Sequence, residues 1–219
     1  MNRAPAYETA MAVGRYVRKK IMAVQRQLQN GNASLARATL ARWRKLSSQD
    51  GASLFMVGDE VLYGWPVEEL GYPDDNTRAV NAVCAALELY ALHQQSKSYP
   101  VAVFESKESG PTRRFTRACR EAQFDLEHAN GFKSRLASVE VATDFDGVVV
   151  NVRGLIRLLR SAKDSKGESR QLLFDYEVLA RDLFLMQLGD ATRKRVLTSW
   201  ASDYFCATQE SDGDESSKA

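Results

Sequence analysis

Apolar residues recur at helical spacing along most of this chain, and the pattern predicts an all-α protein. The cleanest example lies between Asp144 and Lys163, where Val149, Val152 and Ile156 follow one side of the expected helix. The same spacing predicts helices at residues 6–29, 34–46, 77–95, 112–120, 131–140, 175–186 and 190–204. Together these segments make a bundle of about seven to eight helices, either as one unit or as two packed sub-bundles.

Three segments lack this periodicity. Residues 47–75 place glycines and prolines between short apolar runs, which predicts an irregular connection with one or two short helices. Residues 101–104 form a short apolar run that predicts a brief strand. The acidic tail, residues 209–219, is rich in serine and aspartate and is expected to be disordered, so a single helical domain is expected to span residues 1–208.

Several predicted helices begin beside a side chain that can accept a hydrogen bond from the first free backbone N–H groups. Two tryptophans, Trp43 and Trp200, lie within apolar faces, which favours a place in the core over a role as a stacking platform. The candidate N-cap residues are Asn76 or Thr77, Asp144, Asp175 and Asp190.

Charge is distributed unevenly along the chain, although the net charge is only +2. Residues 3–45 carry ten basic side chains against one acid, whereas residues 46–112 carry three against ten. Residues 113–208 carry sixteen against thirteen, and the tail is acidic. Concentrated positive charge favours a polyanionic partner, because Lys and Arg that neutralise phosphates release condensed counterions. A solvated charged helix face is the alternative interpretation.

Arginines on three predicted helices are the candidate nucleic-acid-binding residues. In the segment 144–163 they lie on a different side from the apolar residues, so they are expected to face water or phosphate. Helices hold such cations at fixed intervals, and Arg adds bidentate geometry toward phosphate. Aromatic residues do not alternate with the basic ones, so contact with the backbone rather than with the bases is expected. The candidates are Arg37, Arg42, Arg44, Arg113, Arg114, Arg117, Arg153, Arg157 and Arg160.

Residues suited to catalysis are sparse. The chain has two histidines, His93 and His128, and three widely spaced cysteines, with no metal-binding, nucleotide-binding or hydrolase motif. No metal, cofactor or small-molecule substrate is therefore expected. Residues 139–148 resemble the nucleophile motif of haloacid dehalogenase-like phosphatases, with Asp144 and Asp146 at the reactive positions, but helices rather than strands are predicted after it. A non-catalytic protein is favoured, and an aspartate-nucleophile phosphatase is the alternative.

The chain shows no signal for a membrane. No run of apolar residues approaches the eighteen that a transmembrane helix needs, and charged residues from Glu8 to Lys20 interrupt the N-terminal segment. A cytoplasmic protein without a membrane partner is expected.

Three motifs follow one another in the C-terminal half: VRGLIRLLR at residues 152–160, FDYEVLARDL at 174–183 and VLTSWASDYF at 196–205. They are preceded by a basic helix at 34–45 and a hydrophobic helix at 77–95. In this order the motifs resemble the CasB family, the small subunits of type I-E CRISPR Cascade complexes. The resemblance covers roughly residues 10–207.

This resemblance implies an all-α subunit without catalytic activity, present as two copies beside the backbone subunits and the large subunit of Cascade. Its basic surface would help to hold guide RNA and target DNA, including the displaced non-target strand. The nine candidate arginines would then contact phosphate groups. A helical nucleic-acid-binding or adaptor protein outside CRISPR systems is the alternative.

Overall fold

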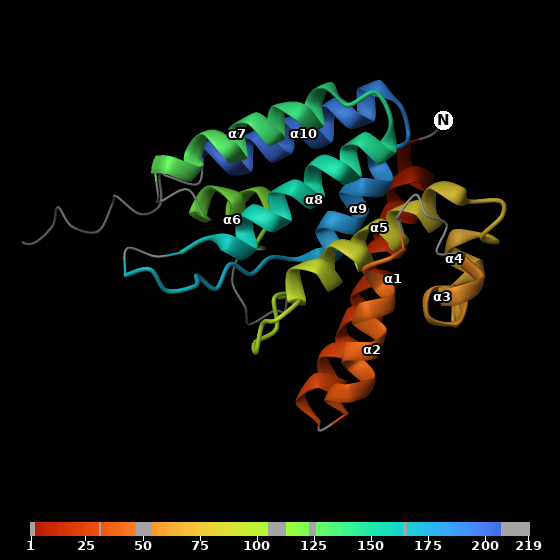
Figure 1. The fold of residues 1–219 in the computed structure, drawn as a ribbon. Helices are drawn as coiled ribbons and strands as arrows, with labels where there is room; N and C mark the ends of the chain where they lie inside the picture. Colours follow the sequence, from red (N-terminus) through yellow and green to blue (C-terminus); the bar gives the residue numbers. More distant parts are fainter. Residues whose placement is uncertain are drawn as a thin grey trace, which may run out of the picture.

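The chain folds into a bundle of helices, which confirms the predicted all-α class. The computed structural model describes residues 3–30, 32–46, 54–104, 113–122, 126–163 and 166–206. No strand of two or more residues occurs within these ranges. Their helices are α1 (Arg3–Gln29), α2 (Ala33–Trp43), α3 (Leu54–Leu62), α4 (Val67–Leu70), α5 (Thr77–Gln94), α6 (Phe115–Glu121), α7 (Leu126–Val141), α8 (Phe145–Ser161), α9 (Tyr176–Leu185) and α10 (Asp190–Cys206) (Figure 1).

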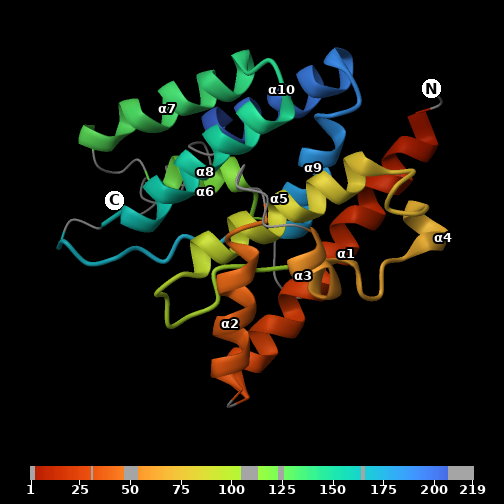
Figure 2. The same cartoon turned by 45° about the vertical axis from the view of Figure 1, so that its right-hand side comes forward.

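The helices form two groups that share one core. In the first group α1 packs against α9, α5 and α2, and in the second α7 packs on α8 and α10 packs on α6. Contacts of α5 with both α8 and α9 join the groups, and buried apolar residues run continuously through them. The hairpin of α1 and α2 projects from the rest of the bundle (Figures 1 and 2). None of the helices in the described ranges is both long and apolar enough to cross a membrane.

The local signals in the sequence correctly predicted where several helices begin. Asp144 accepts a hydrogen bond from the backbone N–H of Gly147 at 2.7 Å, at the start of α8. Asp175 accepts one from Glu177 N–H at 2.8 Å before α9, and Asn76 caps α5 in the same way. These bonds satisfy N–H groups that have no partner within the helix. The apolar side of α8 is buried as predicted.

Both tryptophans assigned to the core are buried, Trp43 at 2% and Trp200 at 4% exposure. Trp200 Nε1 also donates a hydrogen bond of 2.8 Å to buried Asp182, which secures α10 against α9. One or two short helices were predicted within residues 47–75, and two are present, α3 and α4.

Two local predictions were wrong. Residues 101–104 form no strand, because their pairing with the segment before α9 is limited to an isolated parallel bridge between Ala102 and Phe174. The chain turns into the N-cap of α9 directly afterwards, which ends the pairing. The helix expected to begin at Thr112 begins at Phe115, since the Arg113 carbonyl instead accepts a hydrogen bond of 2.7 Å from Asp175 N–H. The predicted acidic tail lies outside the described residues.

Candidate nucleic-acid interface

A groove of about 660 Å³ lies between the α1–α2 hairpin and the turn that follows α5. Arg37 and Arg44 reach it from α2, where their spacing of seven residues places them on the same side of the helix. Lys97 lines it from the turn after α5. Two predicted arginines therefore share this groove with a lysine from a distant part of the chain.

The C-terminal half of α8 adds two further cations beside this groove. Arg160 donates a hydrogen bond of 3.2 Å to the carbonyl of Gln95, and Lys97 donates one of 3.4 Å to the carbonyl of Arg160. Burial, followed by the charges of Arg44 and Arg157, lowers the pKa of Arg160 from its ordinary value. This mutual repulsion shows that cations from α2 and α8 are close together. We call this set the basic groove: Arg37, Arg44, Lys97, Arg157 and Arg160.

The basic groove has unused capacity to bind an acceptor. Arg37 and Arg157 are exposed to solvent. The Nε of Arg160 is buried and has no hydrogen-bond partner among the described residues. A buried donor of this kind is costly unless an acceptor reaches it, and an oxygen of a bound phosphate would satisfy it.

Arg153 shows a different environment from its neighbours on α8. Its guanidinium forms an ion pair with Glu88 of α5, whose side chain is only 2% exposed. Arg153 therefore faces a buried carboxylate of the same chain, which differs from the open surface that helical spacing predicted for it. The reason is that α8 packs against α5 along this side, where the buried carboxylate needs a counter-charge.

Other candidate arginines hold helices together. Arg42 pairs with Glu60 and so joins α2 to α3. Arg114 donates to Ser199 at 2.6 Å and pairs with Asp203 at 3.2 Å, which joins the start of α6 to α10.

The remaining two candidates are on or next to α6. Arg117 pairs with Glu121 within the helix at 3.8 Å, and Arg113, just before the helix, is exposed. Neither residue is among those that line the groove between α2 and α5. The structure thus brings four of the nine candidates together and leaves five elsewhere. Contact of any of the nine with phosphate stays a prediction.

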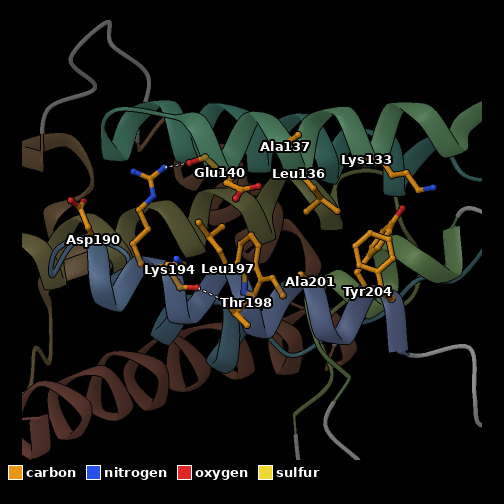
Figure 3. Close-up of a pocket in the computed structure, with 13 residues that line it drawn as sticks. Lys133, Leu136, Ala137, Glu140, Asp190, Lys194, Leu197, Thr198, Ala201 and Tyr204 are labelled. Carbon is orange, nitrogen blue, oxygen red and sulfur yellow. Dashed lines mark hydrogen bonds between the residues drawn. The ribbon is translucent and has the colours of Figure 1, made fainter.

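A larger cavity, of about 680 Å³, lies between α7 and α10 and has a different character. Figure 3 shows Leu136 of α7 and Leu197 and Ala201 of α10 along it, with Lys133 near one end. Its lining is mainly apolar, and its three cations, Lys133, Arg193 and Lys194, share the cavity with the carboxylates of Glu140 and Asp190. The groove beside α2 has three cations and no acidic residue in its lining. The basic groove is therefore the candidate interface.

Comparison with known proteins agrees with the fold and with the sequence motifs. The family model of the CRISPR-associated protein Cse2 matches residues 32–205. The chain belongs to the Cse2 family. A solved structure, the crystal structure of CasB from Thermobifida fusca, is similar with 25% sequence identity and a TM-score of 0.63, and the match covers 88% of this chain and 97% of that chain. No curated protein matches the chain. The predicted CasB-type Cascade family is thereby confirmed.

Within this member of the Cse2 family, Lys97 is the groove residue that sequence reasoning missed. It stands alone in a polar turn, so neither helical spacing nor a local run of charge marks it. Its contact with Arg160 spans 63 residues of sequence. Burial, followed by the charge of Arg160, lowers the pKa of Lys97.

The phosphatase-like motif of this Cse2-family chain lacks the strand that its chemistry requires. Val139 and Val141 belong to the last turn of α7, and Asp144 serves as a helix cap. His93 is buried and stacked on Phe174, and burial lowers its pKa to about 3. Among the described residues, no group of three or more His, Cys, Asp or Glu side chains is arranged to hold a metal ion.

Proposed function

We propose that this Cse2-family chain is a non-catalytic small subunit of a type I-E Cascade complex that binds nucleic acid through the phosphate backbone at the basic groove. The observation that carries the proposal is the gathering of five cationic side chains from α2, α8 and the turn after α5. Membership in the Cse2 family supplies the CRISPR context.

The arrangement favours recognition of backbone over bases. The five cations are carried by packed helices and one turn, so little backbone conformational entropy is lost when phosphates bind. Each phosphate that is neutralised releases counterions, which makes the affinity independent of sequence and strongly dependent on salt. Tyr99 lines the groove beside Lys97, but the aromatic residues needed for a series of stacked bases are not among its lining.

In the complex, the groove would hold guide RNA or target DNA and would stabilise the displaced non-target strand. The proposed protein partners are a second copy of the chain, the Cascade backbone subunits and the large subunit, in the cytoplasm. Similarity to CasB across 97% of that chain supports an equivalent place in the assembly.

The test compares two triple variants with the same change in charge. The groove variant carries Arg37→Glu, Arg44→Glu and Arg157→Glu. The matched control reverses three exposed lysines elsewhere on the bundle, with Lys19→Glu, Lys133→Glu and Lys194→Glu. Binding of a fluorescent single-stranded DNA and a duplex is measured by anisotropy between 50 and 200 mM salt, as in the range over which counterion release is usually followed.

The groove variant should bind at least about tenfold more weakly than the control, and its slope of log affinity against log salt should fall by roughly two to three, which is about 0.7 to 0.9 per lost phosphate contact. When the two variants are introduced into the assembled complex, the complex with the groove variant should hold target DNA less stably than the complex with the control. Equal losses in both variants would mean that only net charge matters, and the basic groove would no longer be the binding site.

A further inference from the structure

A second cavity that contains arginines lies at the other end of α1 from the basic groove. It has a volume of about 290 Å³ and is lined by Ala6 of α1, whereas the basic groove is lined by Gln25 of the same helix. At a rise of about 1.5 Å per residue these positions are about 28 Å apart along the helix. The two cavities are therefore separate. We call this second cavity the arginine pocket, and its guanidinium groups come from Arg114, Arg181 and Arg195.

The three arginines are satisfied to different extents. Arg114 is bonded to Ser199 and Asp203, and Arg195 donates to Thr192 at 3.4 Å. Arg181 has a side chain that is 17% exposed, and its Nε is buried with no hydrogen-bond partner in the part of the chain that the structure describes.

The contacts that Arg181 does make are weak ones. It donates to the sulfur of Met11 at 3.5 Å, its Nε lies 3.9 Å from Asp182, and its guanidinium lies 5.9 Å from the Tyr7 ring centre. A thioether is a poor acceptor for a guanidinium group. One donor of Arg181, its Nε, thus has no hydrogen-bond acceptor among the described residues, and its Nη1 has a thioether as acceptor. A ligand that supplies oxygen acceptors would improve this environment.

The local charge selects the kind of anion. Three guanidinium groups face the carboxyl groups of Asp182, which lines the pocket, and Asp203, which pairs with Arg114. Asp182 already accepts the hydrogen bond from Trp200, and burial raises its pKa to about 6. The remaining excess of positive charge is small, which suits one carboxylate and not a chain of phosphates. Two N–H groups of an arginine fit one carboxylate in bidentate geometry.

The apolar part of the lining favours a carboxylate that is attached to an apolar group. Leu185, Leu188 and Val196 form an apolar wall, and the Tyr7 ring at the rim is 53% exposed. A free inorganic anion would leave this wall in contact with water. An apolar stem next to the carboxylate would cover it and gain the free energy of apolar burial.

We infer that the arginine pocket binds an acidic side chain flanked by apolar residues, presented by a partner protein. The weakly bonded guanidinium of Arg181 takes the carboxylate, Arg195 reinforces it, and the apolar neighbours pack on Leu185, Leu188 and Val196. This site differs from the proposed nucleic-acid groove in position and in ligand, so either can fail without the other.

The test uses the full-length chain and the peptide acetyl-Leu-Glu-Leu-amide, with acetyl-Leu-Gln-Leu-amide as its neutral twin. Binding is followed by the NMR shifts of leucine and valine methyl groups. The Glu peptide should give saturable shifts at Leu185, Leu188 and Val196, and the Gln peptide should bind at least tenfold more weakly. Equal binding of both peptides, or shifts that do not saturate, would overturn the proposal.

Variants then test which arginine is responsible. Arg181→Met should weaken binding of the Glu peptide at least tenfold, and Arg195→Met should weaken it severalfold. Arg26→Met, the same change on an exposed part of α1, should leave binding unchanged. Since Arg181 lies 3.9 Å from buried Asp182, Arg181→Met should melt somewhat earlier than the parent chain, and binding is therefore measured at a temperature at which both chains are folded. If Arg181 has only a structural role, Arg195→Met will bind the Glu peptide as tightly as the parent chain, and the proposal is overturned.

A binding measurement with a nucleotide tests whether the partner is a nucleic acid instead of a protein. Thymidine monophosphate should bind at these methyl groups more weakly than the Glu peptide. Tighter binding of the nucleotide than of the peptide would make the pocket a nucleic-acid site and would refute the assignment to a protein partner.

Discussion

Replacing Arg153 should destabilise the fold, whereas replacing Arg157, one turn further along the same helix, should leave the stability of the fold nearly unchanged. Glu88 is 2% exposed at its side chain and Arg153 is 26% exposed, so the pair is largely out of water. Removing one partner of a buried ion pair costs about 3–5 kcal/mol, because an uncompensated charge remains in the core. The free energy of unfolding of a domain is only about 5–15 kcal/mol in total. Arg153→Ala therefore removes a large fraction of the stability. Arg153→Glu removes more, because it places a second carboxylate next to that of Glu88.

The measurements are equilibrium unfolding in urea and thermal melting, both followed by circular dichroism. In a chain of this size about 1 kcal/mol corresponds to 2–4 °C in melting temperature, so Arg153→Ala should melt roughly 6–20 °C earlier. Arg157→Ala, an exposed change of the same kind, should lie within about 0.5 kcal/mol of the parent chain.

A double variant tests the cause of this loss. Glu88→Leu with Arg153→Met replaces both charges by apolar groups, and it should recover most of the stability lost in Arg153→Ala. The reasoning fails if Arg153→Ala and Arg157→Ala unfold at the same urea concentration. It also fails if the double variant is as unstable as Arg153→Ala.

Three further changes test the core. The pKa of His93 is lowered to about 3, so as the pH falls the unfolded state binds a proton at this residue before the folded state does. The free energy of unfolding therefore decreases as the pH falls below about 6.5. In urea unfolding, His93→Phe should reduce the loss of stability between pH 7 and 4.5 by about 2–3 kcal/mol. The pKa of Asp182 is raised to about 6, so the folded state binds a proton at this residue before the unfolded state does, and the free energy of unfolding rises as the pH falls from 6 toward 4. Asp182→Asn should abolish this gain of up to about 3 kcal/mol, measured in the same way. Gly14→Ala should destabilise by about 1–3 kcal/mol, because a Cβ there would lie 2.7 Å from the backbone oxygen of Glu177; Gly154→Ala, which meets only a flexible side chain, should cost clearly less in thermal melts.

Local interactions explain what could be read from the chain alone. The apolar side of α8 and the capping residues Asp144 and Asp175 involve residues at most a few positions apart, so helical spacing and side-chain type were sufficient. The order of these amphipathic helices was also sufficient to indicate the Cse2 family. Local pattern gave a wrong prediction for residues 101–104, because a strand there would have needed longer pairing with the distant segment around Phe174.

The sequence by itself thus determined the helices, the burial of their apolar sides and the concentration of arginine on a few of them. Only the tertiary structure decided which arginines remain available, because that depends on carboxylates far away in sequence. Arg153 meets Glu88 across the α5–α8 contact, and Arg114 meets Asp203 from a position 89 residues away. Conversely, Lys97 joins Arg160 in the basic groove without any local signal. Helical spacing is a short-range property, whereas the pairing of charges is set by which helix surfaces pack together.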